Sequence, residues 1–201
     1  MTGVARPLRL ALIATLLALS GLGAYVLGTR LAPQPELAGT ALQNPPVVGD
    51  ATLVDPAGRE VTILEAAGGA RVTLVFFGFV RCPDVCPITM ARLAKIYRDL
   101  DEPEDVQVVM VTVDPEHDTP EIVGRYASAF HPSFIGLSGS NSQVAVAARG
   151  FFVGYADIGG GQFTHTEVVA VVDREGRLRY VYGSDKVLRL EHDLPRLQRL
   201  L

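Results

Sequence analysis

The chain combines continuous apolar runs with segments in which apolar residues recur every three or four positions. Two runs, residues 72–79 and 106–113, are rich in β-branched and aromatic residues and are predicted to be buried strands. Between them the apolar residues keep helical spacing, at Met90, Leu93, Ile96, Tyr97 and Leu100. The pattern therefore predicts a strand, a helix and a second strand in succession.

Turn and capping residues place further elements on either side. Residues 50–54 and 60–64 flank the turn sequence Asp55-Pro-Ala-Gly58 and are predicted to form a hairpin. Thr119 suits a helix N-cap, with Pro120 at the first helical position. The predicted helix buries one stripe of side chains: Ile122, Val123, Tyr126, Ala127 and Phe130.

The C-terminal third continues the alternation of strands and helices. A strand is predicted at residues 134–137, and a helix at 140–149 that ends at Gly150. Residues 167–173 and 177–182, joined by a short turn, suit an antiparallel hairpin. A final helix begins near Asp185 and contains Pro195. This order predicts an α/β fold, with a mixed sheet flanked by helices.

The N-terminus has the pattern of a membrane anchor. Arg6 and Arg9, in a short basic segment over residues 1–9, precede an uncharged stretch at 10–29, about the length that spans a bilayer. A cleaved signal peptide is the alternative, but its apolar region is usually shorter and ends in a cleavage site that is missing here. The arginines predict a cytoplasmic N-terminus, with residues 30–47 as a Pro-rich tether and 48–201 as a domain outside.

Composition limits what such a domain can do. The chain has 201 residues, 48% of them hydrophobic, and a formal net charge of −4. This length supports one good core. Nucleic-acid partners are not expected, because phosphate binding requires a concentrated basic face and the sequence has no basic block.

The two cysteines, Cys82 and Cys86, lie where the first predicted strand passes into its helix. A helix N-terminus stabilises thiolates, although Asp84 between the cysteines opposes this effect. Two such sulfurs can close a disulfide or hold a soft metal ion. Apolar filling of the core is the remaining interpretation.

The element order resembles the thioredoxin fold, although thioredoxins proper have two residues between their cysteines and this chain has three. The resemblance to the SCO/SenC family of membrane-tethered copper chaperones is closer and covers about residues 48–192. It rests on the single predicted anchor and on three segments: Phe77-Gly-Phe-Val-Arg-Cys-Pro-Asp-Val-Cys-Pro87, Val113-Asp-Pro-Glu-His-Asp-Thr-Pro120 and Thr164-His-Thr166.

That resemblance implies a thioredoxin-like domain that binds copper, as Cu(I) or Cu(II), through Cys82, Cys86 and His165. It also implies delivery of copper to, or preparation of, the dinuclear copper centre of cytochrome c oxidase, without turnover of a small substrate. The expected partners are the copper-bearing oxidase subunit, a copper donor and a thiol reductant. Thiolates are soft ligands that favour Cu(I), and an imidazole can bind both Cu(I) and Cu(II).

A thiol-disulfide oxidoreductase of thioredoxin type is the second function that the sequence allows. Cys82 would attack and Cys86 would resolve, reducing the cysteines of a partner protein. His165 favours copper, because a redox-only protein has no chemical need of it. Thioredoxin-type enzymes also usually carry a cis-proline near that position, and here the local sequence is Thr164-His-Thr166.

Other polar residues have simpler expected roles. His117 and His131 are expected to be solvated or to cap helices, and His192 has no predicted partner. Asp114 and Asp118 suit the turn and helix start that follow the second strand. A role for them in supporting the site or docking a partner remains open.

The predicted anchor has a direct test. We expect a reporter enzyme fused after Leu201 to be active only outside the cytoplasm, because both arginines precede the apolar run. The mature protein should retain its N-terminus in mass spectrometry. Recovery of a soluble form that begins near residue 25 would show a cleaved signal peptide instead.

Overall fold

The computed structural model describes residues 15–17, 19–23, 36–160 and 162–201, in two compact units, Met1–Glu36 and Leu37–Leu201. In the first unit the described residues 15–17 and 19–23 are helical. Most of the anchor predicted at 10–29 lies outside the described residues. Within the described part, no helix combines the length and apolarity needed to cross a membrane.

The second unit is built on a six-stranded mixed sheet, so the predicted α/β class is confirmed. Its spatial order is β1 (Thr40–Ala41), β10 (Leu178–Gly183), β9 (Val168–Asp173), β4 (Val72–Gly78), β5 (Val106–Thr112) and β6 (Ile135–Leu137). The three strands from β4 to β6 run parallel, whereas β9 is antiparallel to β4. Every residue of β4 is buried, which explains its continuous apolar run.

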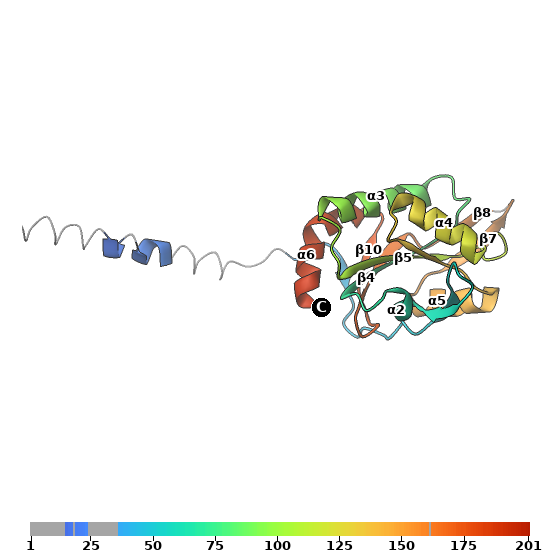
Figure 1. Ribbon diagram of the computed structural model, residues 1–201, viewed down its shortest axis with the longest axis horizontal. Helices are drawn as coiled ribbons and strands as arrows, with labels where there is room; N and C mark the ends of the chain where they lie inside the picture. The colour runs from blue at the N-terminus through green and yellow to red at the C-terminus, as the bar shows by residue number, and fades with distance from the viewer. Residues whose placement is uncertain (1–14, 18, 24–35, 161) are drawn as a thin grey trace, which may run out of the picture. The chain divides into compact units, whose positions relative to one another are not determined.

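Helices cover both faces of this sheet. The helices α3 (Val85–Asp99) and α4 (Pro120–Phe130) lie side by side on one face, and α2 (Ile63–Ala66) and α5 (Asn141–Gly150) lie on the other (Figure 1). The last helix, α6 (Leu190–Leu200), packs against α3. Because α3 and α4 are neighbours, residues at the start of one can act on the other.

The helix starts follow from their capping residues. Thr119 caps α4 by accepting a hydrogen bond from the Ile122 amide, with Pro120 in the first turn, as predicted. The strand predicted at residues 60–64 is wrong in its second half, because Thr62 and Glu65 form a capping box that starts α2. The sequence Thr-Ile-Leu-Glu carries this signal. The predicted strand therefore ends at Thr62, and α2 begins at the next residue.

Two small hairpins form two-stranded sheets of their own. The predicted pairing of β2 (Thr52–Val54) with β3 (Glu60–Thr62) is confirmed as antiparallel. A second antiparallel hairpin, β7 (Tyr155–Gly159) with β8 (Gln162–His165), was not predicted. His165 is the last residue of β8.

The N-terminal part of the second unit attaches to the sheet edge and to α6. Within the stretch predicted as a tether, β1 pairs antiparallel with β10. The buried Asp193 accepts hydrogen bonds from the Ala38 amide at 2.7 Å and from the Tyr182 hydroxyl at 2.9 Å. One carboxylate thus joins the incoming chain, β10 and α6.

Contact between β6 and α4 leaves no space for a side chain at Gly136. A Cβ there would overlap the Val123 carbonyl and lie 2.8 Å from the Gly124 amide nitrogen. We expect Gly136→Ala to lower the free energy of unfolding by about 1–3 kcal/mol, the usual cost of overpacking a core. Urea denaturation of residues 31–201 measures this.

Gly150→Ala is the matched control. Its Cβ would meet only Val48, at 3.8 Å, and the residue ends a helix. We expect the free energy of unfolding of Gly150→Ala to be equal to that of the wild type or slightly higher. Equal stabilities of the two variants would contradict the close approach at Gly136.

Candidate functional site

The two cysteines lie at the junction between β4 and α3, in what we call the cysteine loop, residues 79–84, and in the first turn of the helix. Asp84 is the N-cap residue of α3, but its side chain makes no capping hydrogen bond. The Cys82 sulfur takes this place by accepting a hydrogen bond from the Cys86 amide at 3.4 Å. The first cysteine thus satisfies a helix-end amide that would otherwise lack a partner.

The two sulfurs have different surroundings. Both cysteines are free thiols, but Cys82 is partly exposed whereas Cys86 is 0% exposed. A Cβ on Gly78 would lie 2.9 Å from the Cys86 sulfur, so the end of β4 has to be glycine to make room for it. One sulfur is therefore accessible and the other is enclosed.

Burial decides the acidity of Cys86. Desolvation, followed by its hydrogen bond with Cys82, raises the pKa of the Cys86 thiol well above its usual range. This direction is opposite to the thiolate stabilisation expected from a helix N-terminus, because desolvation is the largest influence on the buried thiol. Cys86 therefore keeps its proton unless a cation replaces it.

His165 meets the buried sulfur from a distant part of the chain. Its Nε2 lies 3.6 Å from the Cys86 sulfur, although 79 residues separate them. Its Nδ1 lies 3.3 Å from the Thr166 carbonyl oxygen, which can only accept a hydrogen bond, so Nδ1 carries the proton. In the neutral imidazole the Nε2 lone pair is then directed at the cysteine side.

The unpredicted hairpin is what brings His165 to this position. Phe163 on β8 packs against Phe79 of the cysteine loop, with ring centroids 5.5 Å apart. The base of the hairpin is tied by the Thr166 amide to the Gly154 carbonyl, at 2.9 Å. Its sequence signal was the Gly159-Gly-Gly turn between two short segments.

Two buried carboxylates hold the cysteine loop. Asp118 accepts hydrogen bonds from the Val80 amide at 2.9 Å and from the Thr112 hydroxyl at 2.6 Å. Burial raises the pKa of Asp118, and these two hydrogen bonds act against the rise. Asp114, 2% exposed, pairs with Arg81 at 2.8 Å and with the His117 imidazole at 2.8 Å. The open supporting role of these aspartates thus has a physical basis.

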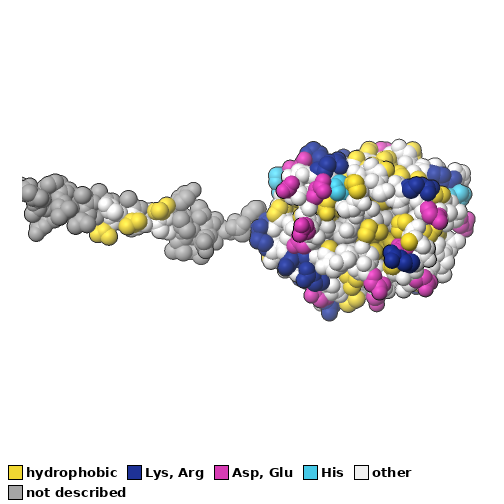
Figure 2. Space-filling view, viewed as in Figure 1, with side chains coloured by type: hydrophobic (Ala, Val, Ile, Leu, Met, Phe, Trp, Pro, Cys, Tyr) yellow, Lys and Arg dark blue, Asp and Glu magenta, His cyan; other side chains and the backbone are white. Residues whose placement is uncertain are grey.

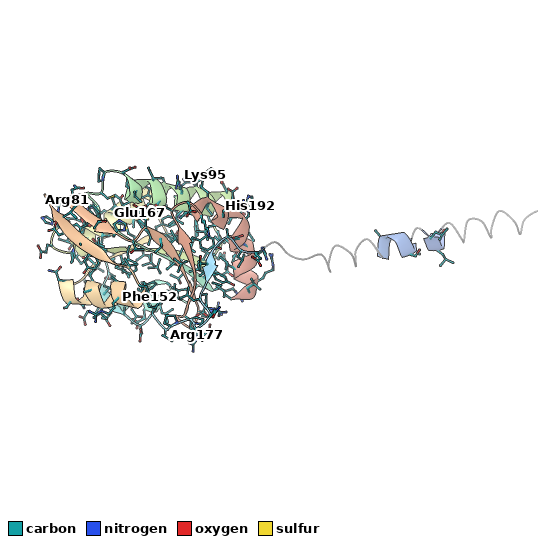
Figure 3. The ribbon with its side chains drawn as sticks, turned by 180° about the vertical axis from the view of Figure 1, so that it is seen from behind. Arg81, Lys95, Phe152, Glu167, Arg177 and His192 are labelled. Atoms are coloured by element: carbon teal, nitrogen blue, oxygen red, sulfur yellow. The ribbon has the colours of Figure 1, made fainter. Side chains whose placement is uncertain are left out.

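The remaining histidines lie away from the sulfur pair. His131 is the C-cap residue of α4, as one of its two expected roles allowed, but it is buried rather than solvated. It packs on Tyr97, bonds to Ser133 and pairs with Glu102. His192 is exposed and lies on α6, at the end of the domain opposite Arg81 and Glu167 (Figure 3). Neither contacts the cysteines in the described structure.

The structure brings the predicted site residues together in pairs. Cys82 contacts the Cys86 amide, and Cys86 contacts His165. Among the described residues, no three His, Cys, Asp or Glu side chains are grouped closely enough to hold a metal ion as they stand. Cys82 is the third candidate donor, and the hydrogen bond from the Cys86 amide keeps its sulfur beside Cys86. Two sulfurs and one imidazole nitrogen are a donor set that suits a soft cation.

Charged side chains of both signs are mixed on one face of the molecule. On the face shown in Figure 2, basic and acidic side chains of the described residues are interspersed, with apolar groups between them.

Comparison with known proteins gives a consistent match over the second unit. Residues 39–194 match the SCO1/SenC family. An "SCO2-like protein" of Rickettsia felis is 32% identical over 176 residues, which cover 82% of this chain and 85% of that protein.

Two solved structures share the fold. The apo Sco1 protein of Thermus thermophilus is 44% identical, with a TM-score of 0.71, over 83% of this chain and 98% of that one. Arabidopsis thaliana ScoI, solved with copper bound, is 30% identical, with a TM-score of 0.69, over 77% of this chain and 99% of that one.

The unequal burial of the two thiols predicts unequal reactivity. With iodoacetamide at fixed pH, we expect Cys82 to be alkylated at least about tenfold faster than Cys86, since each unit of raised pKa removes tenfold of the reactive thiolate. Peptide mass spectrometry at timed intervals measures both rates. In denaturant the two rates should converge, and equal rates in the native protein would contradict the enclosed position of Cys86.

Proposed function

The chain belongs to the SCO1/SenC family, and on this basis we propose that it binds one copper ion through Cys82, Cys86 and His165 and serves the assembly of cytochrome c oxidase. The observation that carries the proposal is the 3.6 Å contact between the Cys86 sulfur and the His165 Nε2. A whole hairpin is folded against the cysteine loop to make this contact. A protein that used only its dithiol would not need it.

The donor set supports copper as the cargo. Thiolate sulfurs are soft ligands that suit Cu(I), and an imidazole nitrogen suits both Cu(I) and Cu(II). The Nδ1 proton of His165 is held by the Thr166 carbonyl, which leaves Nε2 free to act as a ligand. Arabidopsis thaliana ScoI, a relative with the same fold, was solved with copper bound.

Binding is coupled to proton loss at Cys86. The raised pKa of this thiol means that it is protonated before copper arrives, and a metal ligand has to be a thiolate. Uptake therefore releases at least one proton. The partly exposed Cys82 offers the first contact for the incoming ion, and the enclosed Cys86 and the partly exposed His165 complete its coordination.

The wider role follows from the family and from the N-terminal sequence. We propose that the domain delivers copper to, or prepares, the dinuclear copper centre on the copper-bearing oxidase subunit. Its other proposed partners are a copper donor and a thiol reductant. The charge pattern around residues 10–29 supports a single-pass anchor in the cytoplasmic membrane, with the domain on the periplasmic side.

A thiol-disulfide oxidoreductase is the second candidate function, favoured by the unequal exposure of the two thiols. An exposed Cys82 suits the attacking position, and a buried Cys86 suits the resolving position. The two functions can coexist, because a protein that loads thiolate sites benefits from keeping them reduced. Of the two functions, only copper binding requires the imidazole of His165.

Copper titration of residues 31–201 tests the proposal. We expect the reduced domain to bind one Cu(I) in competition with a chelator. A Cys82–Cys86 disulfide removes both sulfur ligands, so the oxidised domain should bind none tightly. Cys82→Ser and Cys86→Ser should each abolish tight binding. Equal affinity of the oxidised and reduced domains would refute the ligand set.

His165→Ala separates the two candidate functions. We expect Cu(II) affinity to fall at least about tenfold while the fold and the dithiol stay intact. His192→Ala, an exposed histidine at the other end of the domain, is the matched control and should change nothing. An unchanged copper affinity and spectrum in His165→Ala would favour the oxidoreductase.

A further inference from the structure

The outer side of α6 carries basic side chains that the chemistry above does not use. The inner side of the helix packs against the domain through its buried residues, Leu190, Asp193, Leu194 and Leu197. Residues spaced by three, four and three positions share one side of a helix. On α6 and its N-cap this spacing joins four basic residues, which we call the basic row: Arg189, His192, Arg196 and Arg199.

The basic row is open to solvent and has little negative charge beside it. Arg189, His192 and Arg199 are exposed. Within the described residues, neither Arg189 nor Arg199 belongs to an ion pair. Of the two acidic residues on α6, Asp193 is buried, and Glu191 is partly buried and lies outside the spacing of the row. The row therefore presents positive charge to a partner outside the domain.

Two exposed leucines flank the basic row. Leu188, directly before Arg189, is 51% exposed, and Leu200, directly after Arg199, is 60% exposed. Basic side chains next to large apolar ones are the combination with which amphipathic helices lie on an anionic membrane surface. An acidic protein would pair with the arginines but would not by itself require the leucines. The composition of this surface therefore favours a lipid layer as its occupant.

The chain also enters the domain at this helix. The Ala38 amide donates a hydrogen bond to the Asp193 carboxylate of α6, at 2.7 Å. Only residues 30–37 separate the predicted anchor from Ala38 in the sequence, and eight residues reach at most about 30 Å when fully extended. A domain of this size has a radius of gyration of about 15 Å. The membrane of the proposed anchor is thus within reach of α6.

We propose that the basic row is a docking surface for the anionic phospholipid headgroups of the membrane, with Leu188 and Leu200 entering the headgroup layer. The inference rests on the membrane anchor of the proposed function. His192 lies at the end of the domain opposite Arg81 of the cysteine loop (Figure 3). Docking through α6 therefore directs the cysteine loop away from the bilayer, so that a partner protein meets the exposed Cys82 from the aqueous side.

An indole introduced by Leu188→Trp reports this contact, because the chain has no tryptophan of its own. The full chain is reconstituted in nanodiscs of phosphatidylcholine with brominated acyl chains, with or without about 30% phosphatidylglycerol as the anionic lipid. We expect bromine to quench the indole emission only when phosphatidylglycerol is present, and high salt to restore the emission by screening the charges. Leu200→Trp is a second reporter, at the other end of the basic row, and should respond in the same way.

The double variant Arg189→Gln/Arg199→Gln tests the charges in this reporter background. Each arginine near an anionic surface favours the bound state by about fivefold, so we expect the ratio of docked to undocked domain to fall by about 25-fold. Arg125→Gln/Arg149→Gln is the matched control, because it removes the same charge from exposed positions on α4 and α5. Arg149 also lies in the last turn of its helix, as Arg199 does. The control should keep the quenching of the parent chain.

Equal quenching with and without phosphatidylglycerol, or undiminished quenching in Arg189→Gln/Arg199→Gln, would overturn the docking surface. An indole that is quenched in neither type of nanodisc would overturn it as well, and would leave an acidic protein as the occupant of the basic row. A chain that does not stay with phosphatidylcholine membranes in high salt would instead overturn the proposed anchor. Flotation of that chain with phosphatidylglycerol vesicles would then decide on the basic row alone.

Discussion

The hydrogen bond from the Val80 amide to the buried Asp118 carboxylate is the contact on which the geometry of the site depends. It joins the cysteine loop to the segment between β5 and α4, and Thr112 holds the same carboxylate from the strand. A carboxylate that is 1% exposed cannot exchange these donors for water, so the loop and the start of α4 are fixed together. Phe79, in the same loop, is then placed to receive the hairpin that carries His165.

Much of this arrangement could be predicted from the sequence, for identifiable reasons. β4 and β5 are buried on both faces, so their apolar runs are unbroken. Thr119 and Pro120 fix the start of α4 through local chemistry alone. The cysteines and His165 were found as candidate residues from motifs, and the structure brings Cys86 and His165 into contact.

The features that the sequence did not predict depend on tertiary surroundings. The β7–β8 hairpin has mostly exposed residues, so it lacks the alternation that marks a half-buried strand. The acidity of Cys86 was predicted with the wrong sign, because the depth of burial of a helix-start residue is not visible in its spacing. His131 is buried by its contacts with Tyr97, which comes from α3, and with Phe134, three residues further along the chain. The short helix α2 did have a signal, the Thr62 and Glu65 capping box.

The two edges of the main sheet have a consequence for how copies of this chain meet. One edge is β1, with two residues, and the other is β6, with three. An exposed edge invites a strand from another molecule to pair with it, and a very short edge offers few hydrogen bonds for such pairing. In the described unit, the long β4 and β5 are enclosed by their neighbours. Pairing between the sheets of two copies along these edges is therefore limited to a few hydrogen bonds.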